Sequence, residues 1–404
     1  MRNLLLVLVS VLLSLLLAEL ALRFVGWGPP GVPPASSANN ADRGFRYDPA
    51  YAYEPSPGSW IRPLLAPDRP DQADARGLRT GHPQAKPPGT LRILTLGDSV
   101  VHAVEVAREH SWPERLEAQL RAASGQSLQV INGGVSGYVS WQARARLERH
   151  GLAYAPDLVL LLVGWNDFYF GSQPNWRPRM TLVDFEQAKQ AAPEQPIDRT
   201  LKAWLKTHSA IAYWVARARE QQFLRRLQAQ VQDQRLSDCS TPFNEAALSE
   251  YLQELDALAA ELAARELPLA IVRFPLLPGT EPRPPQEVQD KMLTHYYNAP
   301  LCYREYREGH ARYLAAIDAF SARHPEVILI DAHRAFEALP YEEKSALFVD
   351  LAHLTAEGND LLARVASESL LAASERWLDR REDDASAMPH GASKSVSAAD
   401  SGRP

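Results

Sequence analysis

The sequence is short of cysteine and of charge runs of one sign. Its 404 residues include two cysteines, Cys239 and Cys302, which are too few for a disulfide framework or a cysteine-based metal site. If the domain is exported, the two thiols could form one bridge. Two separate buried thiols fit the sequence equally well, so the pairing stays open.

Basic runs and cofactor signatures are also missing. The net charge is −6, and no stretch interleaves basic with aromatic residues, which argues against a nucleic-acid-binding surface. No grouping of histidine, cysteine and carboxylates has metal-site spacing, and no Walker or Rossmann glycine signature occurs. We therefore expect no metal and no cofactor, and composition leaves the oligomeric state open.

One long apolar run stands at the N-terminus. Apolar residues predominate from Leu4 to Trp27, interrupted by Glu19 and Arg23. An apolar helix of ~20 residues can span a bilayer. We therefore predict that residues 1–27 form an uncleaved transmembrane signal anchor, with Arg23 reaching the far interface. A cleaved signal peptide is the alternative, although no clear Ala-x-Ala site follows. With an anchor, the downstream domain is expected to be periplasmic or otherwise outside the cytoplasm.

Composition divides the rest of the chain into one domain and less regular segments. Residues 28–45 are rich in proline, glycine and serine and are predicted to be a linker. The domain is expected over 46–380, with an irregular, proline-rich lead-in at 46–90. A charged helical insertion at 171–245 is either a solvated decoration or a lid beside the site. Residues 381–404 lack a core-forming pattern and are predicted to be disordered.

Strand and helix patterns alternate within this domain. The predicted strands are 93–96, 128–131, 157–163, 267–274 and 327–330, and the predicted helices are 112–123, 141–150, 246–264, 303–323 and 354–371. The run from 157 to 163 is almost continuously apolar, which is typical of a strand buried on both faces. Such alternation predicts an α/β fold, with a parallel sheet covered by helices on both faces.

Ser99 is the first candidate for chemistry. A short apolar strand ends in Gly97-Asp98-Ser99, and a helical pattern follows. This arrangement puts Ser99 at the carboxyl edge of the sheet, where α/β proteins hold their active sites. Ser99 is therefore a candidate nucleophile. The alternative is a serine in a helix-capping turn.

Two further turns could stabilise an oxyanion. The stretch Asn132–Tyr138 is glycine-rich, so that the N–H of Gly137 could approach a ligand closely. Asn166 follows the most apolar strand and could supply a fixed amide donor to a developing negative charge. The alternatives are a tight strand-to-helix turn for the first stretch and a turn-capping role for Asn166.

Asp350 and His353 are the candidate acid–base pair. Three positions apart on a helical turn, Asp350 can accept from one imidazole nitrogen while the other faces a nucleophile. Alternatively, Asp350 or Thr355 caps the last helix, and His353 lies on the surface. Asp331 and His333 form a rival pair, since residues two apart share a face of an extended segment. That pair lacks helical proximity, and we prefer Asp350 with His353.

Together, four blocks resemble the SGNH (GDSL-type) hydrolase family. They are Gly97-Asp98-Ser99, Ser136-Gly137-Tyr138, Gly164-Trp165-Asn166-Asp167 and Asp350-x-x-His353, in the family's order and spacing within residues 90–375. The resemblance implies a three-layer α/β/α, flavodoxin-like fold. It also implies hydrolysis of carboxylic esters, or acyl transfer, through an acyl-serine. Gly77-Leu78-Arg79 resembles the lead-in of membrane-anchored bacterial members.

The resemblance also implies residue roles. Ser99 would be the nucleophile of a triad completed by Asp350 and His353, and the Ser99 N–H, Gly137 and Asn166 would form the oxyanion hole. Two departures, Val100–Val104 and Trp165, are expected to narrow the pocket. The expected substrate is a small ester, a lipid or an acylated glycan. An O-acyltransferase or deacetylase of envelope polysaccharide, and a non-catalytic envelope binding protein, are the alternatives.

Overall fold

The computed structural model describes residues 2–25, 44–48, 52–173, 175–182, 184, 243–279 and 303–378, with scattered positions between 209 and 222. Both cysteines, most of the 28–45 linker, most of the 171–245 insertion and the whole 381–404 tail lie outside the described residues. The predictions made for these segments therefore remain predictions.

A five-stranded parallel sheet forms the centre of the domain. Its strands are β5 (Leu91–Gly97), β6 (Leu128–Asn132), β7 (Leu158–Leu162), β8 (Leu269–Val272) and β9 (Ile328–Ile330). They lie in the order β6-β5-β7-β8-β9, and each neighbouring pair is parallel. This is the flavodoxin-like strand order, so the predicted α/β fold is confirmed.

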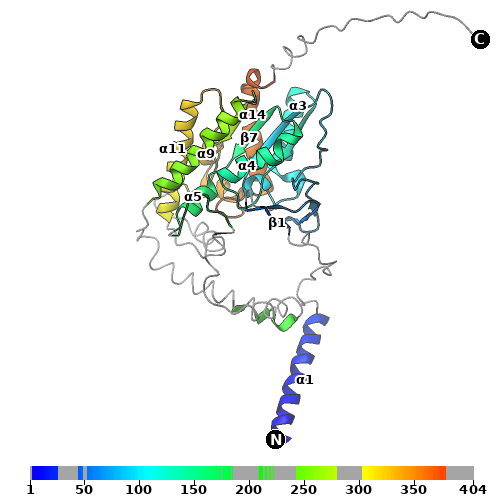
Figure 1. Ribbon diagram of the computed structural model, residues 1–404. Helices are drawn as coiled ribbons and strands as arrows, with labels where there is room; N and C mark the ends of the chain where they lie inside the picture. Colours follow the sequence, from blue (N-terminus) through cyan, green and yellow to red (C-terminus); the bar gives the residue numbers. More distant parts are fainter. Residues whose placement is uncertain are drawn as a thin grey trace, which may run out of the picture.

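Helices cover both faces of the sheet (Figure 1). The helices α3 (Trp112–Ser124) and α14 (Ala356–Ala372) pack together on one face. On the other lie α4 (Ser140–Arg149), α9 (Glu245–Ala263) and α11 (Tyr303–Arg323), with α5 (Trp165–Gly171) against α9 and α11. Shorter elements are α2 (Ser99–His102), α12 (Ala332–Glu337), α13 (Tyr341–Ala346) and the 3₁₀ turns Arg108–His110, Gly151–Tyr154 and Ser374–Arg376.

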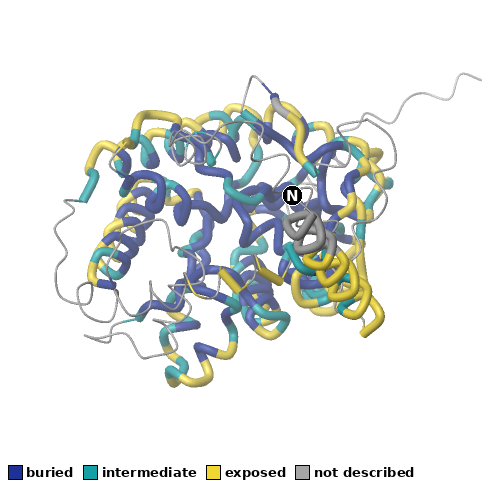
Figure 2. The backbone as a smooth tube through the Cα atoms, turned by 90° about the horizontal axis from the view of Figure 1, so that it is seen from below, coloured by how far each residue is buried: buried dark blue, intermediate teal, exposed yellow. Residues whose placement is uncertain are grey.

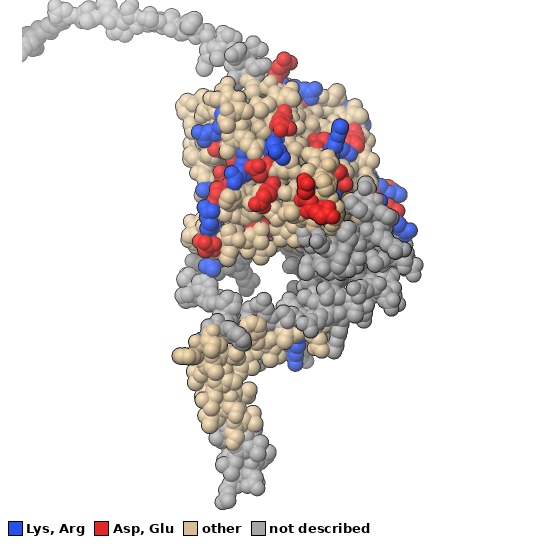
Figure 3. All heavy atoms as spheres, turned by 180° about the vertical axis from the view of Figure 1, so that it is seen from behind, with Lys and Arg blue, Asp and Glu red and all other residues tan. Residues whose placement is uncertain are grey.

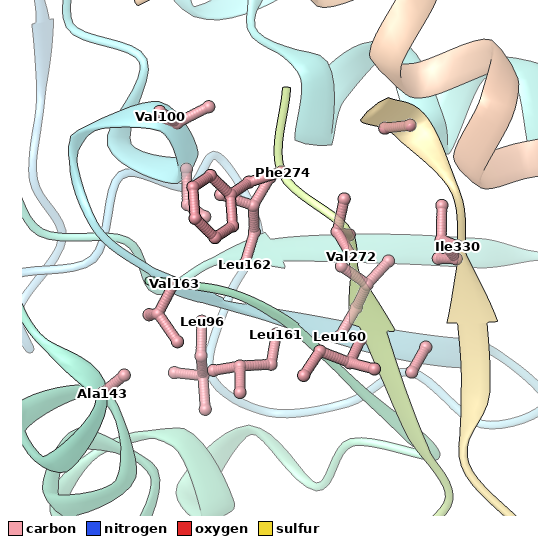
Figure 4. Close-up of a cluster of buried hydrophobic side chains, with 14 of the residues drawn as sticks. Leu96, Val100, Ala143, Leu160, Leu161, Leu162, Val163, Val272, Phe274 and Ile330 are labelled. Atoms are coloured by element: carbon pink, nitrogen blue, oxygen red, sulfur yellow. The ribbon is translucent and has the colours of Figure 1, made fainter. Parts of the chain in front are cut away.

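The core lies between these layers. Every residue of β5, β7 and β8 is buried, because helices exclude water from both faces of the strands. Figure 4 shows side chains from β5, β7, β8 and β9 in one cluster, among them Leu96, Leu161, Val272 and Ile330. Truncating such a leucine to alanine costs about 2–5 kcal/mol. The sheet is therefore a rigid base for the turns at its carboxyl edge.

The lead-in contains two small antiparallel pairs in place of wholly irregular chain. They are β1 (Phe45–Asp48) with β2 (Ala52–Pro55), and β3 (Trp60–Ile61) with β4 (Asp71–Gln72). Gly77 has φ +74°, and a Cβ there would lie 2.3 Å from the Pro55 carbonyl oxygen. The Gly77 carbonyl also accepts a hydrogen bond from Arg146 of α4. The lead-in therefore packs closely on the domain.

The N-terminal segment forms α1 (Arg2–Phe24). No helix among the described residues combines the length and the apolarity needed to cross a bilayer, so the expected transmembrane anchor is not found. The acidic Glu19 lies within α1, pairs with Arg23 at 2.8 Å and accepts hydrogen bonds from the backbone of Ala210 and Ile211. Polar contacts thus occupy the part of the helix that was expected at a lipid interface.

The surface differs between α1 and the domain. Figure 2 shows exposed residues along much of α1 and buried backbone through the centre of the domain. On the face seen in Figure 3, acidic and basic side chains of the described residues are interspersed. The expected location of the domain outside the cytoplasm stays a prediction.

Candidate active site

Ser99 is the first residue of α2 and directly follows the turn at the end of β5. The turn needs Gly97, whose φ is +156° and whose Cβ, if present, would lie 2.0 Å from the Leu162 carbonyl oxygen. Asp98 caps α2 by accepting the Val100 N–H at 2.9 Å. As the first helical residue, Ser99 has an N–H without a partner inside the helix, and its side chain reaches the carboxyl edge of the sheet.

His353 lies between Ser99 and Asp350. Its Nε2 is 2.7 Å from Ser99 Oγ, and its Nδ1 is 2.6 Å from Asp350 Oδ2. The second oxygen of Asp350 accepts the backbone N–H groups of Ala352 and His353, both at 2.9 Å. The carboxylate therefore orients the imidazole, and the imidazole reaches a hydroxyl 254 positions away in the chain.

The turn that carries this pair is not helical, contrary to the expectation. Residues 349–353 form a tight loop closed by an isolated antiparallel bridge between Phe348 and Leu354. Thr355, and not Asp350, caps α14, because its hydroxyl accepts the Gly358 N–H. Asp350 is therefore available for the imidazole.

The rival pair does not form. Asp331 Oδ1 is 2.7 Å from Arg273 Nη1 and also accepts the Arg334 N–H as the cap of α12. The ring of His333 meets that of His310, with centroids 5.0 Å apart. Its buried Nδ1 has no hydrogen-bond partner among the described residues.

Charge around His353 favours its protonated form. Desolvation opposes a charge on the buried ring, but the carboxylates of Glu105, Asp350 and Asp98 outweigh it and raise the pKa of His353 to about 10. Glu105 Oε1 lies 3.7 Å from Nε2, on the side that faces Ser99. Burial raises the pKa of Asp98 to about 7, although the Val100 N–H and His353 act in the opposite direction.

The two predicted oxyanion-hole loops adjoin each other. Asn166, near the start of α5, donates its Nδ2–H to the Tyr138 carbonyl at 2.9 Å. An amide nitrogen has two hydrogens, so this bond uses one and orients the other. Gly137 precedes Tyr138 and has φ +82°, a backbone conformation that favours glycine. Asp167 joins the loops further by accepting the Ser140 N–H.

A model of the GDSL-like Lipase/Acylhydrolase family matches residues 95–361, which is more than half of the chain. The chain belongs to this family. The match includes all five residues that were predicted to form the site, and it leaves out the whole lead-in at 46–90.

This GDSL-family protein is similar to two curated enzymes and to a solved structure. An arylesterase from Vibrio mimicus is 39% identical over 83 residues, 20% of this chain and 41% of that protein. The Escherichia coli K12 thioesterase 1/protease 1/lysophospholipase L1 is 30% identical over 105 residues, 26% of this chain and 48% of that protein. The chain thus spans less than half the length of these relatives. A lipase/acylhydrolase structure from Enterococcus faecalis shows 13% identity and a TM-score of 0.40, covering 70% of this chain and 96% of that one.

Residues outside the predicted set also contact the site of this GDSL-family protein. Tyr53 donates its hydroxyl to the Ser136 carbonyl at 2.8 Å, and its oxygen lies 2.6 Å from where a Gly137 Cβ would stand. His102 Nδ1 is 3.0 Å from Ser136 Oγ. Desolvation lowers the pKa of His102 to about 3, so the ring is neutral. No spacing signal pointed to these residues, because each acts across the fold.

Trp165 and the valines after Ser99 pack into the interior of this GDSL-family protein. Trp165 is 3% exposed and stacks on Tyr169 and Tyr306 between α5 and α11. Val101 is fully buried and contacts the glycine turn at Gly134. Val100–Val104 and Trp165 were expected to narrow the pocket beside Ser99. These contacts give no support to that expectation.

Proposed function

We propose that this GDSL-family protein is a serine esterase that hydrolyses carboxylic esters through an acyl-serine intermediate. The single observation that supports it best is the contact series from Ser99 Oγ through the two nitrogens of His353 to Asp350 Oδ2, at 2.7 and 2.6 Å. A hydroxyl is a weak nucleophile until an adjacent base takes its proton, and the base needs a third group to fix its tautomer. In this contact series His353 is the adjacent base, and Asp350 is the group that fixes its tautomer.

The proposed reaction has two halves. Ser99 Oγ attacks the ester carbonyl carbon while His353 Nε2 takes the hydroxyl proton. The N–H groups of Ser99 and Gly137 and the side-chain amide of Asn166 bind the resulting oxyanion. When the tetrahedral intermediate collapses, the bond to the alcohol oxygen breaks, and His353 returns the proton to that oxygen. Water then attacks the acyl-Ser99 with His353 again as base, which releases the acid and restores the hydroxyl.

A fluorophosphonate probe and a series of p-nitrophenyl esters test this proposal. The wild type should label at Ser99 and release p-nitrophenol, and Ser99→Ala should do neither. Ser249→Ala, which removes an exposed hydroxyl from α9, is the matched control and should behave as the wild type. The preferred acyl length separates short-chain esters from lipids. A wild type that neither labels nor turns over any ester would favour a non-catalytic binding protein.

Transfer of the acyl group to a sugar hydroxyl begins with the same acyl-Ser99. Adding a polyol acceptor to the ester assay distinguishes the two outcomes. If the enzyme is a hydrolase, free acid remains the main product when acceptor is added. If acylated acceptor becomes the main product, transfer is the activity.

A further inference from the structure

Glu105 brings a second carboxylate to His353. Its Oε1 lies 3.7 Å from Nε2, the nitrogen that also faces Ser99 Oγ. Asp350 holds the opposite nitrogen, so Glu105 is not needed to orient the ring. The Glu105 side chain is 11% exposed, so solvent reaches part of it. Its position therefore calls for a role toward the substrate.

The loop that carries Glu105 is held firmly by the lead-in. The guanidinium of Arg79, whose side chain is fully buried, donates to three carbonyl oxygens of this region, those of His102, Ala103 and Val106. Two backbone N–H groups of the lead-in donate to the two carbonyls between them, Leu64 to Val104 at 3.0 Å and Leu65 to Glu105 at 2.8 Å. Such backbone support keeps a side chain in one place, as binding sites require.

Proton transfer tells which part of the ester lies near Glu105. After acyl-enzyme formation, Nε2 gives its proton to the oxygen of the departing alcohol, so that oxygen must come within hydrogen-bond reach of Nε2. The Glu105 carboxylate is 3.7 Å from the same nitrogen. It therefore flanks the alcohol portion of the ester, whereas the acyl carbonyl oxygen faces Gly137 and Asn166.

We propose that Glu105 is a specificity-determining residue that selects esters whose alcohol presents hydroxyl donors or a positive charge, a role that rests on the proposed esterase function. A carboxylate accepts hydrogen bonds and attracts cations, and it repels an anionic alcohol. Polyols and ammonium alcohols share this chemistry. Esters of anionic alcohols are the disfavoured class.

Matched acetate esters test the selection in the wild type. Acetylcholine is compared with 3,3-dimethylbutyl acetate, its uncharged isostere, and glycerol monoacetate with propyl acetate, which lacks free hydroxyls. We expect kcat/KM to favour acetylcholine about tenfold, between the effects of a charge contact in bulk water and of one near a protein surface. Added salt should weaken this preference, because salt screens charges that solvent reaches. The glycerol pair separates hydroxyl recognition from recognition of charge.

Glu105→Gln removes the charge with little change of shape, and Glu109→Gln is its matched control. Glu109 is a nearby exposed carboxylate that pairs with Arg69. Glu105→Gln should abolish the preference for acetylcholine and shift the pH profile of kcat/KM toward lower pH, because one of the carboxylates facing His353, beside Asp350 and Asp98, is then neutral. Glu109→Gln should keep both properties.

The outcomes separate this role from the proposed function. A wild type that labels at Ser99 and hydrolyses these acetates without preference overturns the role of Glu105 and leaves the esterase standing. The same conclusion follows if folded Glu105→Gln keeps the preference. If circular dichroism shows that Glu105→Gln is unfolded, the test rests on the wild type. Its kcat/KM ratios for the matched acetates and their salt dependence then decide whether the alcohol is selected. A wild type without labelling or turnover overturns both proposals.

Discussion

Two Asp–His pairs follow one another along the chain, near the last strand and before the last helix, and they meet different neighbours. Asp350 contacts His353, and His353 contacts Ser99. Asp331 instead contacts Arg273. The same two residue types therefore give one hydrogen-bonded series and one ion pair.

The local backbone explains the first part of this difference. Asp350 receives two backbone N–H groups on one oxygen, and this tight turn brings the imidazole of His353 to the other oxygen. Asp331 caps α12, and His333 is the second residue of that helix. Side chains two positions apart at a helix start do not face each other. Arg273 then takes up the carboxylate.

Electrostatics separates the two histidines further. Burial lowers the pKa of His333, with Arg273 and Lys344 acting in the same direction and Glu337 against them. The pKa of His353 is raised despite burial, because carboxylates face the ring. Burial near cations thus favours the neutral imidazole of His333, and carboxylates around the buried His353 favour its protonated form.

Replacing the histidines separately should give the largest effect. His353→Ala should lower kcat by about 10⁴–10⁶-fold, the scale for loss of a triad base. His333→Ala should retain kcat near the wild type, because His333 contacts neither Ser99 nor Asp350. Steady-state kinetics on one p-nitrophenyl ester measures both. Loss of turnover in His333→Ala alone would make the other pair the catalytic one.

Replacing Asp350 and Asp331 separately should give the second largest difference in kcat. Asp350→Asn should reduce kcat on the order of 10⁴-fold, because the amide no longer fixes the tautomer of the imidazole. Asp331→Asn is the matched control and should leave kcat unchanged. Equal losses in the two variants would mean that the contact with His353 does not matter for the reaction.

The pH dependence should follow His353 and not His333. A base must be neutral to take the Ser99 proton, and the pKa of His353 is raised to about 10. The kcat/KM of the wild type should therefore rise with pH from neutrality into the alkaline range. His333→Ala should leave the curve in place. A plateau reached near pH 6.5, the ordinary pKa of histidine, would contradict the raised value.

The smallest expected effect is on the free energy of unfolding, and it concerns the two carboxylates that pair with Arg273. Asp331→Ala removes the cap of α12 and the partner of Arg273, so we expect a loss of about 1 kcal/mol in the free energy of unfolding. Asp318→Ala removes the more exposed partner of Arg273 and should cost about 0–1 kcal/mol. Urea unfolding measures both. A larger loss in Asp318→Ala would show that the cap contributes little.

Local sequence patterns were sufficient to predict most of the helices and strands of the domain. The apolar run at 157–163 became β7, and the leucine spacing at 246–264 became α9, each with both ends shifted by one residue. The N-terminal helix was also predicted, but no helix among the described residues has the length and apolarity expected of a membrane span. Glu19 contacts a residue 191 positions away, and the hydropathy of neighbouring residues cannot predict such a contact.

The sequence by itself determined the strand–helix alternation, the Gly97 turn before Ser99 and the order of the family's blocks, because these depend on neighbouring residues. Only the tertiary structure decided that Asp350 contacts His353 and His353 contacts Ser99, while Asp331 contacts Arg273. It alone brought Glu105 of one loop and Tyr53 of the lead-in to the site. These contacts join residues far apart in the chain, and the packing of the sheet and its helices sets their distances.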